Sequence, residues 1–535
     1  MTLDSHRLVD MPKSGVVVCH IKNYHPVYMS VPGSGHRNAQ GTPTKDRVCI
    51  GKLDQATGKL IPNAAYFVRF GDAASLELVP VYKSYRLIGG AFLVDVVMGR
   101  LGLIETLNEV LGLERSRLAR MAALYMVARG NVFDSVIDYC ETNTLFEAPL
   151  SSQMASRLFS GITHDERMAF FKRWAARQSP ATFMAFDVTS FSTLAKGVAT
   201  SEFGYNRDGE RIPQINIGCY VSENSRLPVF YVTYNGSIVD HCALPSMMAY
   251  NAELGVSKAS FVMDRGFCST NNVKYMDSNG HDFIIGVEKR HKTPRMALEL
   301  LRSELTKVAN QIDSGLFAMS KKGCFYGTTS TMHVYYAQDL SDAQTDALFR
   351  SIDDEESRLA QKRKLTPMEA KEYSNHFAIV LSSDGSFTFK RDLDRIEQAA
   401  KHCGYFYLLS NTALDKVEVL AKYRQKNVIE KSFDDLKNYV SMKRLNTHNT
   451  ETTDGKLFCA FIALIVTSEI EVKLGKFMRK KRIDKAGLFR EMEKICVISN
   501  DKGWRLMNPV TKTQRTIMEE IGLNEKDLGA YLRKG

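Results

Sequence analysis

Two aspartates accompany short apolar stretches of the kind that form buried strands. Asp187 ends one expected strand, at 182–188, and Asp264 follows another, at 259–263. Carboxylates at the ends of neighbouring strands are well placed to share a divalent metal ion. Taken singly, each aspartate is more often a turn former or a helix cap. The metal-site interpretation therefore needs further groups.

Such groups lie on a long helix expected at 413–440. At about 100° per residue, one stripe of this helix carries a hydroxyl, two ammonium groups and a carboxylate, from Tyr423, Lys426, Lys437 and Glu430. An apolar stripe runs beside it, formed by Ile429, Phe433, Leu436 and Val440. Alone, the polar row would be a solvated helix face with an i, i+4 ion pair.

Taken together, these residues supply what phosphodiester chemistry requires. Three carboxylates can hold two divalent ions, and the cations and the hydroxyl can hold phosphates. Two ions about 4 Å apart would activate a water and stabilise the leaving 3′ oxygen of an in-line displacement. The set indicates a two-metal phosphodiester site.

The elements around these residues predict an α/β core. Strands are expected at 182–188, 214–221, 228–234 and 259–263, with helices at 244–254 and 270–276. Three strands, a helix and a further strand is the order of a ribonuclease-H-like sheet. A strand at 405–409, the helix at 413–440 and an apolar helix at 457–470 complete the pattern.

The rest of the chain divides around this core. Residues 15–70 predict short strands with a glycine-rich loop at 32–44 and a hairpin at 55–58. The helical pattern after them is either a DNA-end-binding module or a packing layer. The expected order is a β element (1–80), the helical module (81–178), the core's first part (179–288), an α+β insertion (289–402), the core's second part (403–472) and a basic helical C-terminal tail (473–535).

Composition limits the function classes. The 535 residues exceed what one core usually holds, and 44% hydrophobic with 24% charged residues is ordinary for a globular protein. The net charge of +11 favours a polyanionic partner. The ten cysteines form no C-x-x-C pair, which indicates reduced thiols and no zinc site. The longest apolar run, 457–466, is too short for a membrane span and no signal peptide is evident, so we expect a cytoplasmic protein without a membrane partner.

With these residues in place, the sequence resembles the DDE transposases of bacterial insertion sequences. The branch in question carries a Tyr-Arg-Glu-Lys signature with gaps of two, three and six residues. Tyr423, Glu430 and Lys437 match it, and Lys426 stands where the family usually has Arg. The resemblance extends over roughly 180–470 and includes the segments 204–214, 235–240, 264–267, 404–406, 433–437 and 443–445, with a familiar hairpin at 50–62.

The resemblance implies roles for these residues. Asp187, Asp264 and Glu430 would hold two Mg²⁺ ions, for which Mn²⁺ may substitute. The residues implied to hold DNA phosphates are Tyr423, Lys426, Lys437, Arg265 and Arg444. The implied activity is DNA transposition: binding of terminal inverted repeats by a homodimer, cleavage of one strand, and attack of the freed 3′-OH on target DNA. It would take place in the bacterial cytoplasm, on the nucleoid when the protein is bound to DNA.

Two other functions remain open at this point. A ribonuclease-H-like nuclease without strand transfer would need the same carboxylates, and a catalytically silent DNA-binding descendant would keep the fold and the charge. A further choice concerns aromatic residues of the expected insertion. They either stack on an unpaired base of a DNA hairpin intermediate or simply pack the inserted sheet, and they are Phe325, Tyr326, Tyr335 and Tyr336.

Overall fold

The computed structural model of the chain describes residues 8–21, 25–38, 40–70, 84–146, 148–178, 184–254, 260–500 and 503–533. It divides into two compact units. The N-terminal unit comprises Met1–Tyr85 and Val497–Met507, and the core unit comprises Arg86–Cys496 and Asn508–Gly535. In the described part of the chain, no helix combines the length and the apolar character that crossing a membrane requires.

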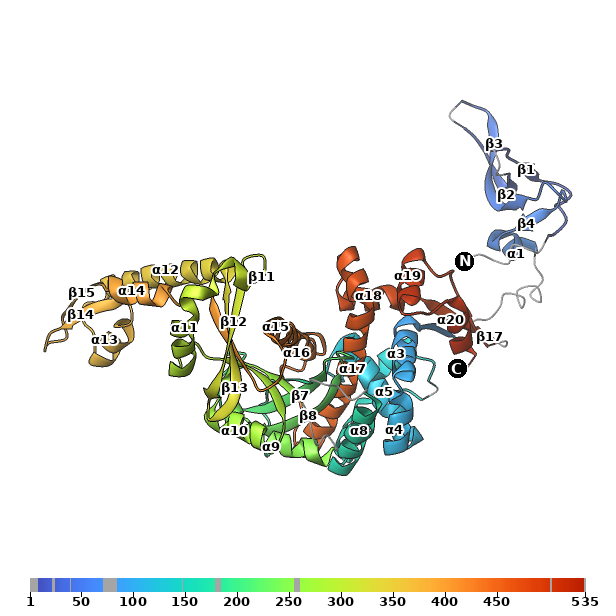
Figure 1. Cartoon of the computed structure of the whole chain (residues 1–535). Coiled ribbons are helices and arrows are strands. Elements are labelled where there is room, and N and C mark those ends of the chain that lie inside the picture. Colours follow the sequence, from blue (N-terminus) through green and yellow to red (C-terminus); the bar gives the residue numbers. More distant parts are fainter. Residues whose placement is uncertain are drawn as a thin grey trace. The chain divides into compact units, whose positions relative to one another are not determined.

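An antiparallel sheet in the order β1-β2-β3-β4 forms the N-terminal unit (Figure 1). Its elements are β1 (Val16–Val18), β2 (Pro26–Arg37), β3 (Pro43–Leu53), β4 (Leu60–Pro62) and helix α1 (Ala64–Phe70). Val27, Ile50 and Leu60 are fully buried, and Tyr66 of α1 packs against them. The hairpin expected at 55–58 joins β3 to β4. The loop expected at 32–44 is wrong in extent, because β2 and β3 continue to pair through most of it.

Beyond this sheet, β17 (Cys496–Asn500) and β18 (Gly503–Leu506) pair with each other and with β5 (Ser84–Leu87) in the order β18-β17-β5. The hydroxyls of Ser84 and Ser499 lie 3.1 Å apart.

Helices form one layer of the core unit (Figure 1). They are α3 (Gly89–Arg100), α4 (Leu103–Leu111), α5 (Leu113–Arg129), α6 (Val136–Asn143), α7 (Ser152–Gly161) and α8 (His164–Arg177). They pack around α17 (Thr450–Lys481), whose segment 457–466 is buried on all sides. A helix that is apolar all round has to be a core helix. The helical module thus has the contacts of a packing layer, which was one of its two expected interpretations.

The expected C-terminal tail is only partly helical, because strands β17 and β18 lie within it, and it does not extend freely from the core. Its helices are the end of α17, α18 (Lys485–Glu493), α19 (Lys512–Glu520) and α20 (Glu525–Leu532). Tyr531 of α20 lies edge-on to Phe92 of α3, with ring centroids 5.3 Å apart, and donates a hydrogen bond to Asp95 at 3.0 Å. Apolar residues between the basic ones therefore make this region part of the helical layer.

A nine-stranded mixed sheet forms the other layer, in the order β11-β12-β13-β16-β10-β9-β6-β7-β8. Its strands are β6 (Met184–Ser192), β7 (Gln214–Ser222), β8 (Pro228–Asn235), β9 (Ser260–Met263), β10 (Asp282–Val287), β11 (Gln311–Asp313), β12 (Leu316–Phe325), β13 (Thr328–Ala337) and β16 (Tyr405–Ser410). Strands β9 and β10 are connected by the short helix η1 (Arg265–Phe267) and by α10 (Thr270–Ser278), and α9 (Asp240–Glu253) precedes β9. Residues 182, 183 and 259 of two expected strands lie outside the described residues.

The expected insertion at 289–402 is only partly separate from the core. After α11 (Lys292–Leu305), strands β11 to β13 extend the main sheet, because β13 pairs with β16 along its length. Only α12 (Gln338–Gln361), α13 (Pro367–Tyr373), β14 (Phe377–Leu381), β15 (Phe387–Arg391) and α14 (Leu393–Ala400) form a small subdomain. Its own core is built from Ile352, Leu359, Leu365, Phe377 and Ile396.

The close contact between α17 and α7 gives a first prediction. A Cβ atom on Gly455 would overlap the backbone carbonyl of Phe159. We expect Gly455→Ala to lower the free energy of unfolding by about 2 kcal/mol or more, because a rigid backbone must shift. Gly99→Ala is the control, since its Cβ would lie 3.8 Å from Ile104 and the change gains up to about 1 kcal/mol of helix propensity. Urea denaturation followed by circular dichroism measures both, and equal midpoints for the two variants would contradict the packing.

Candidate active site

The two aspartates lie side by side because their strands are parallel. β6 pairs with β9 in register, and Phe186 lies opposite Met263 as the last pair. Asp187 and Asp264 are the next residues on the two strands. The expectation that Asp187 ends its strand is wrong, because β6 continues to Ser192 and pairs with β7 along that length. The polar residues of this continuation are buried in the sheet, where a polar stretch in the sequence does not look like a strand.

Both aspartate side chains are held by local backbone groups. The Asp264 carboxylate caps η1 by accepting a hydrogen bond from Arg265 N at 2.8 Å. The Asp187 carboxylate accepts one from Val188 N at 2.8 Å. Tyr423 donates its hydroxyl to Asp264 Oδ1 at 3.3 Å. These bonds fix the direction of each carboxylate but leave further lone pairs open.

The helix expected at 413–440 is broken into three pieces. α15 (Lys416–Arg424) ends just before Lys426, α16 (Asn427–Asp434) begins after it, and a π-helical segment η3 (Asp435–Tyr439) follows. Tyr423, Lys426 and Glu430 of the expected stripe still meet around Asp264, whereas Lys437 in η3 pairs with Asp208 instead. Lys426 lies at the first break, and its side chain is only 8% exposed.

The ammonium of Lys426 joins the carboxylates of the site. Its Nζ lies 3.0 Å from Glu430 Oε1 and 3.5 Å from Asp264 Oδ1. Glu430 is more than half exposed, whereas Asp187 is partly buried. Two of the three expected carboxylates, Asp264 and Glu430, thus pair with one buried cation, and the charge of Asp187 acts on the same ammonium group.

Burial and these charges shift the pKa values of the site. Burial raises the pKa of Asp187 to about 6, although Lys426 and Arg207 oppose the shift. Burial alone would lower the pKa of Lys426, but Asp187, Asp264 and Glu430 outweigh it and the pKa is raised. Lys426 is therefore a permanent cation near neutral pH, while Asp187 titrates within reach of it.

The side chains of Lys437 and Arg444 pair with acidic residues other than those that contact Lys426. Lys437 Nζ of η3 lies 2.7 Å from Asp208 Oδ2, and Arg444 Nη2 lies 2.9 Å from Glu210 Oε1. Both acidic residues lie in the segment between β6 and β7. Arg265, the remaining expected phosphate contact, is exposed and pairs loosely with Glu288 at 3.6 Å.

Sequence reasoning missed this segment as a functional element. Besides Asp208 and Glu210 it contains Arg207, which pairs with Asp240 of α9 and affects the pKa of Asp187. Tyr234 donates a hydrogen bond to the same Asp240 carboxylate at 2.7 Å. The resemblance covered 204–214 and 235–240 without giving these residues a role. The alternation of basic and acidic residues in 207–211 is the sequence signal that could have indicated such a role.

Among the aromatic residues of the expected insertion, the contacts of Tyr335 decide between the two interpretations. Tyr335 is fully buried, stacks on Phe406 with centroids 4.8 Å apart, and donates its hydroxyl to Lys416 O at 2.7 Å. It packs the sheet, so a base-stacking role for Tyr335 is excluded. Tyr326 lies at the tip of the β12–β13 hairpin, where its hydroxyl is 3.1 Å from His291 Nδ1.

The carboxylates fit a divalent ion by their chemistry. Oxygen donors of this kind are the ligands that Mg²⁺ prefers. As the chain stands, Lys426 lies among them. No three His, Cys, Asp or Glu side chains of the described residues are close enough together to hold one metal ion.

Comparison with known proteins identifies the family. The family model described as "Transposase DDE domain" matches residues 178–466, more than half of the chain. The chain belongs to this family of transposases. A search of curated proteins finds no match.

Among solved structures, this transposase is similar to one described as "Cryo-EM structure of piggyBac transposase synaptic complex with hairpin DNA". The TM-score is 0.36 at 11% sequence identity, over 78% of this chain and 75% of that chain. A similarity of this size says nothing about how the present transposase acts. The family itself implies action on DNA with divalent metal ions.

The raised pKa of Asp187 predicts a pH-dependent cost in stability. The Asp187 carboxyl has a pKa of about 6 in the folded state and about 4 in the unfolded chain, so its protonated form favours folding. This contribution to the free energy of unfolding is lost as the pH rises from about 4 to 6. We expect Asp187→Asn to stabilise the metal-free protein by roughly 1 to 3 kcal/mol at pH 8 and by almost nothing at pH 4. Chemical denaturation at the two pH values measures this, and a constant difference would show that Asp187 titrates normally.

Proposed function

We propose that this transposase binds the terminal inverted repeats of its element, cleaves one DNA strand and joins the freed 3′ end to target DNA. The observation that carries the proposal is the pairing of β6 with β9, which brings Asp187 next to Asp264. Glu430 reaches the same place through the shared contact with Lys426. Three carboxylates from separate elements are thus available around Lys426, and two-metal phosphodiester chemistry needs such a set.

The sheet supports a ribonuclease-H-like core for this site. Its central part runs β8-β7-β6-β9-β10, with the first three strands antiparallel and the last two parallel to β6 and to each other. Along the chain, the three strands, the helix α9 and the further strand β9 follow in the order expected from the sequence for such a core. Helices α9 and α10 connect the strands at the points where that order requires crossovers.

Asp187, Asp264 and Glu430 would hold two Mg²⁺ ions, or Mn²⁺ in their place. When bound, the ions would activate the attacking water or 3′-OH and stabilise the leaving 3′ oxygen. The chain's own residues then have distinct tasks. Val188 N and Arg265 N orient the aspartates, and Lys426 is released from the carboxylates toward the phosphate of the strand that is cut.

The cations expected to bind DNA are covered by the chain's own carboxylates. Asp208 lies on Lys437 and Glu210 on Arg444, at distances that a phosphate oxygen would also take. The side chains of Lys437 and Asp208 are 11% and 24% exposed, so this ion pair is partly shielded from water. DNA must displace the acidic residues, which favours binding of a polyanion with several phosphates over a single anion.

The proposed function also has consequences for the oligomeric state and the cellular location of the protein. Joining two ends requires two active sites, so we propose a homodimer in the complex with DNA, acting in the cytoplasm of a bacterium. Tyr423 and Arg265 border Asp264 and would contact the phosphates next to the cut.

A nuclease without strand transfer needs the same carboxylates but leaves only cut ends, whereas a silent descendant would cut nothing.

The carboxylates are tested by neutral substitutions. We expect Asp187→Asn, Asp264→Asn and Glu430→Gln each to reduce Mg²⁺-dependent cleavage of a labelled inverted-repeat duplex by at least about a thousandfold, since each removes metal charge. Binding of the duplex should change little. Glu299→Gln, an exposed residue of α11, is the matched control and should cut normally. Cleavage without joined products in the parent protein would favour the nuclease, and undiminished cleavage in a variant would remove that residue from the triad.

The covered cations are tested by releasing one of them. Asp208→Asn frees Lys437, so we expect duplex affinity to rise about three- to tenfold at low salt, whereas Lys437→Ala should lower the salt-dependence slope by about one phosphate contact. Asp353→Asn removes the same charge from a 2.6 Å pair with Arg391 in the small subdomain and should leave affinity unchanged. Equal gains for both aspartate variants would mean that only net charge matters.

A further inference from the structure

The two long strands of the N-terminal unit form a ribbon that extends beyond the unit's small core. Near its base, Val27 of β2 and Ile50 of β3 are fully buried. Between 35 and 48 the described residues of the ribbon are almost all exposed, and the turn at its tip spans 38–42. A two-stranded ribbon with both faces in water is marginally stable by itself. This length of exposed strand is better explained by a partner than by folding.

The register sorts the charges of the ribbon by face. Gly35 pairs with Lys45, and Arg37 pairs with Pro43. Paired residues point to the same face and alternate residues share it. Arg37, Lys45 and Arg47 therefore lie on one face, opposite residues with little or no side chain in their way.

The acidic residue of the ribbon lies on the other face. Asp46 stands between Lys45 and Arg47 in the sequence, so its side chain points away from theirs. It lies 3.8 Å from His36 Nδ1, which confirms that these two share the second face. Arg37 donates a hydrogen bond to Gly41 O at 2.6 Å, which holds it to the turn without neutralising it. Among the described residues, Arg37, Lys45 and Arg47 form no ion pair.

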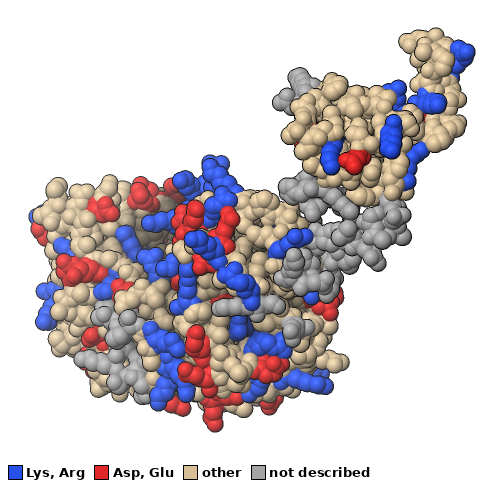
Figure 2. Space-filling view, turned by 90° about the vertical axis from the view of Figure 1, so that its right-hand side faces the viewer, with Lys and Arg blue, Asp and Glu red and all other residues tan. Residues whose placement is uncertain are grey.

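The wider surface of the unit has the same sign. Residues 8–70 contain eight Lys and Arg, three Asp and no Glu. On the face seen in Figure 2, basic side chains of the N-terminal unit stand on a mostly uncharged surface, whereas those of the core unit lie among acidic ones. In the core unit some cations pair with the chain's own carboxylates, as at Lys437 and Arg444. The ammonium and guanidinium groups of Arg37, Lys45 and Arg47 on the ribbon are thus available to bind an anionic partner.

We propose that the Arg37, Lys45 and Arg47 face of the β2–β3 ribbon binds the phosphate backbone of double-stranded DNA. The major groove of DNA admits a two-stranded ribbon, and cations spaced about 7 Å apart along a strand can contact successive phosphates. The proposal rests on the proposed function, because it supplies a DNA contact outside the family's catalytic domain, which begins at residue 178. Phosphate contacts of this kind fix position and do not read sequence.

The test uses the full chain in the cleavage-inactive Asp187→Asn background. Duplex DNA with the element's own end and an unrelated duplex of equal length are titrated by fluorescence anisotropy over a KCl series. We expect the triple change Arg37→Ala, Lys45→Ala and Arg47→Ala to reduce the slope of log affinity against log salt by about 2.7 on both duplexes. Affinity near 0.1 M salt should fall at least tenfold.

Matched controls separate the ribbon from net charge. A triple change of three exposed cations in the small subdomain, Arg350→Ala, Lys371→Ala and Lys390→Ala, removes the same charge and should leave the slope unchanged. Asp46→Asn, on the opposite face of the ribbon, should not reduce it either. Should the ribbon triple variant misfold by circular dichroism, Lys45→Gln alone should still lower the slope by about one.

Two results would overturn the proposal. One is an unchanged slope in the correctly folded ribbon variants, and the other is an equal loss in the subdomain control. Failure of the proposed function looks different, because the parent protein with native Asp187 would then not cut the end duplex with Mg²⁺. That result leaves the salt slope of the ribbon measurable, so the two failures can be told apart.

Discussion

The ammonium of Lys426 among three carboxylates is the interaction on which the rest of the site depends. Asp187, Asp264 and Glu430 come from two strands and a helix, and close approach of three negative charges is unfavourable unless a cation lies between them. Lys426 supplies this cation from the break between α15 and α16. The cation thereby offsets the mutual repulsion of the carboxylates, and burial raises the pKa of Asp187 to about 6. A lysine suits this position because its charge is compact and its stem flexible, so it can leave when other cations arrive.

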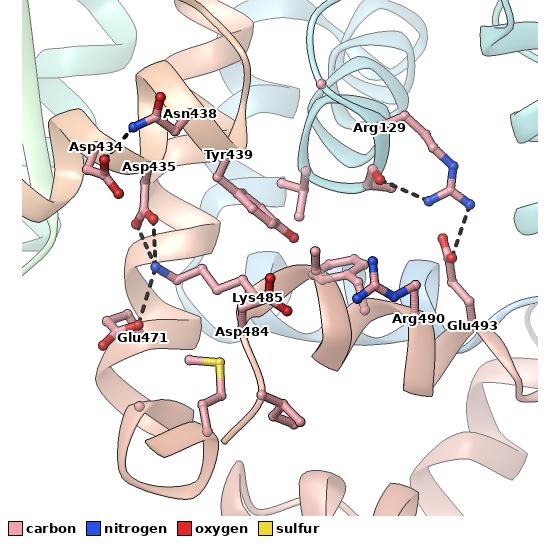
Figure 3. A pocket seen from close by; sticks show the side chains of 18 of the residues that line it. Arg129, Asp434, Asp435, Asn438, Tyr439, Glu471, Asp484, Lys485, Arg490 and Glu493 are labelled. Atoms are coloured by element: carbon pink, nitrogen blue, oxygen red, sulfur yellow. Dashed lines mark hydrogen bonds and ion pairs between the residues drawn. The ribbon is translucent and has the colours of Figure 1, made fainter. Parts of the chain in front are cut away.

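The helix that provides Lys426 and Glu430 needs its own support, because it is broken twice. Behind η3 lies a cavity of about 930 Å³, lined by residues of α5, η3, α17 and α18 (Figure 3). On its wall Lys485 contacts both carboxylate oxygens of Asp435 at 2.7 Å and also Glu471 at 3.3 Å. These contacts tie the π-helical segment to the helical layer. A π-helical segment often marks a functional position, and Lys437 in this segment pairs with Asp208.

Sequence periodicity predicted the strands well and the helix poorly, for physical reasons. The strand predicted at 214–221 is β7 with one residue fewer, since apolar runs that end in turn residues have few alternatives. The aspartates could be proposed from strand ends, but their adjacency depends on the register between β6 and β9, which no local pattern encodes. The turn at Lys426 and the π-helical segment η3 depart from a fixed angle per residue, so the calculation misplaced Lys437. The ion-pair partners of these cations could not be predicted from the sequence either, because residues such as Asp208 and Lys437 lie far apart along the chain.

Charge is handled differently in the two units, and this follows from what each must do. Around Asp187, Asp264 and Glu430, an uncompensated cation would compete with metal ions, and an uncompensated carboxylate would repel DNA. Ion pairs within the chain, such as those of Lys426, Lys437 and Arg444, would prevent both the competition with metal ions and the repulsion of DNA until DNA and metal ions bind together. Among the described residues of the ribbon there is no expected metal ligand, and Arg37, Lys45 and Arg47 form no ion pair with another described residue. A transposase built in this way would attract DNA by one surface and admit it to the other only in exchange for its own carboxylates.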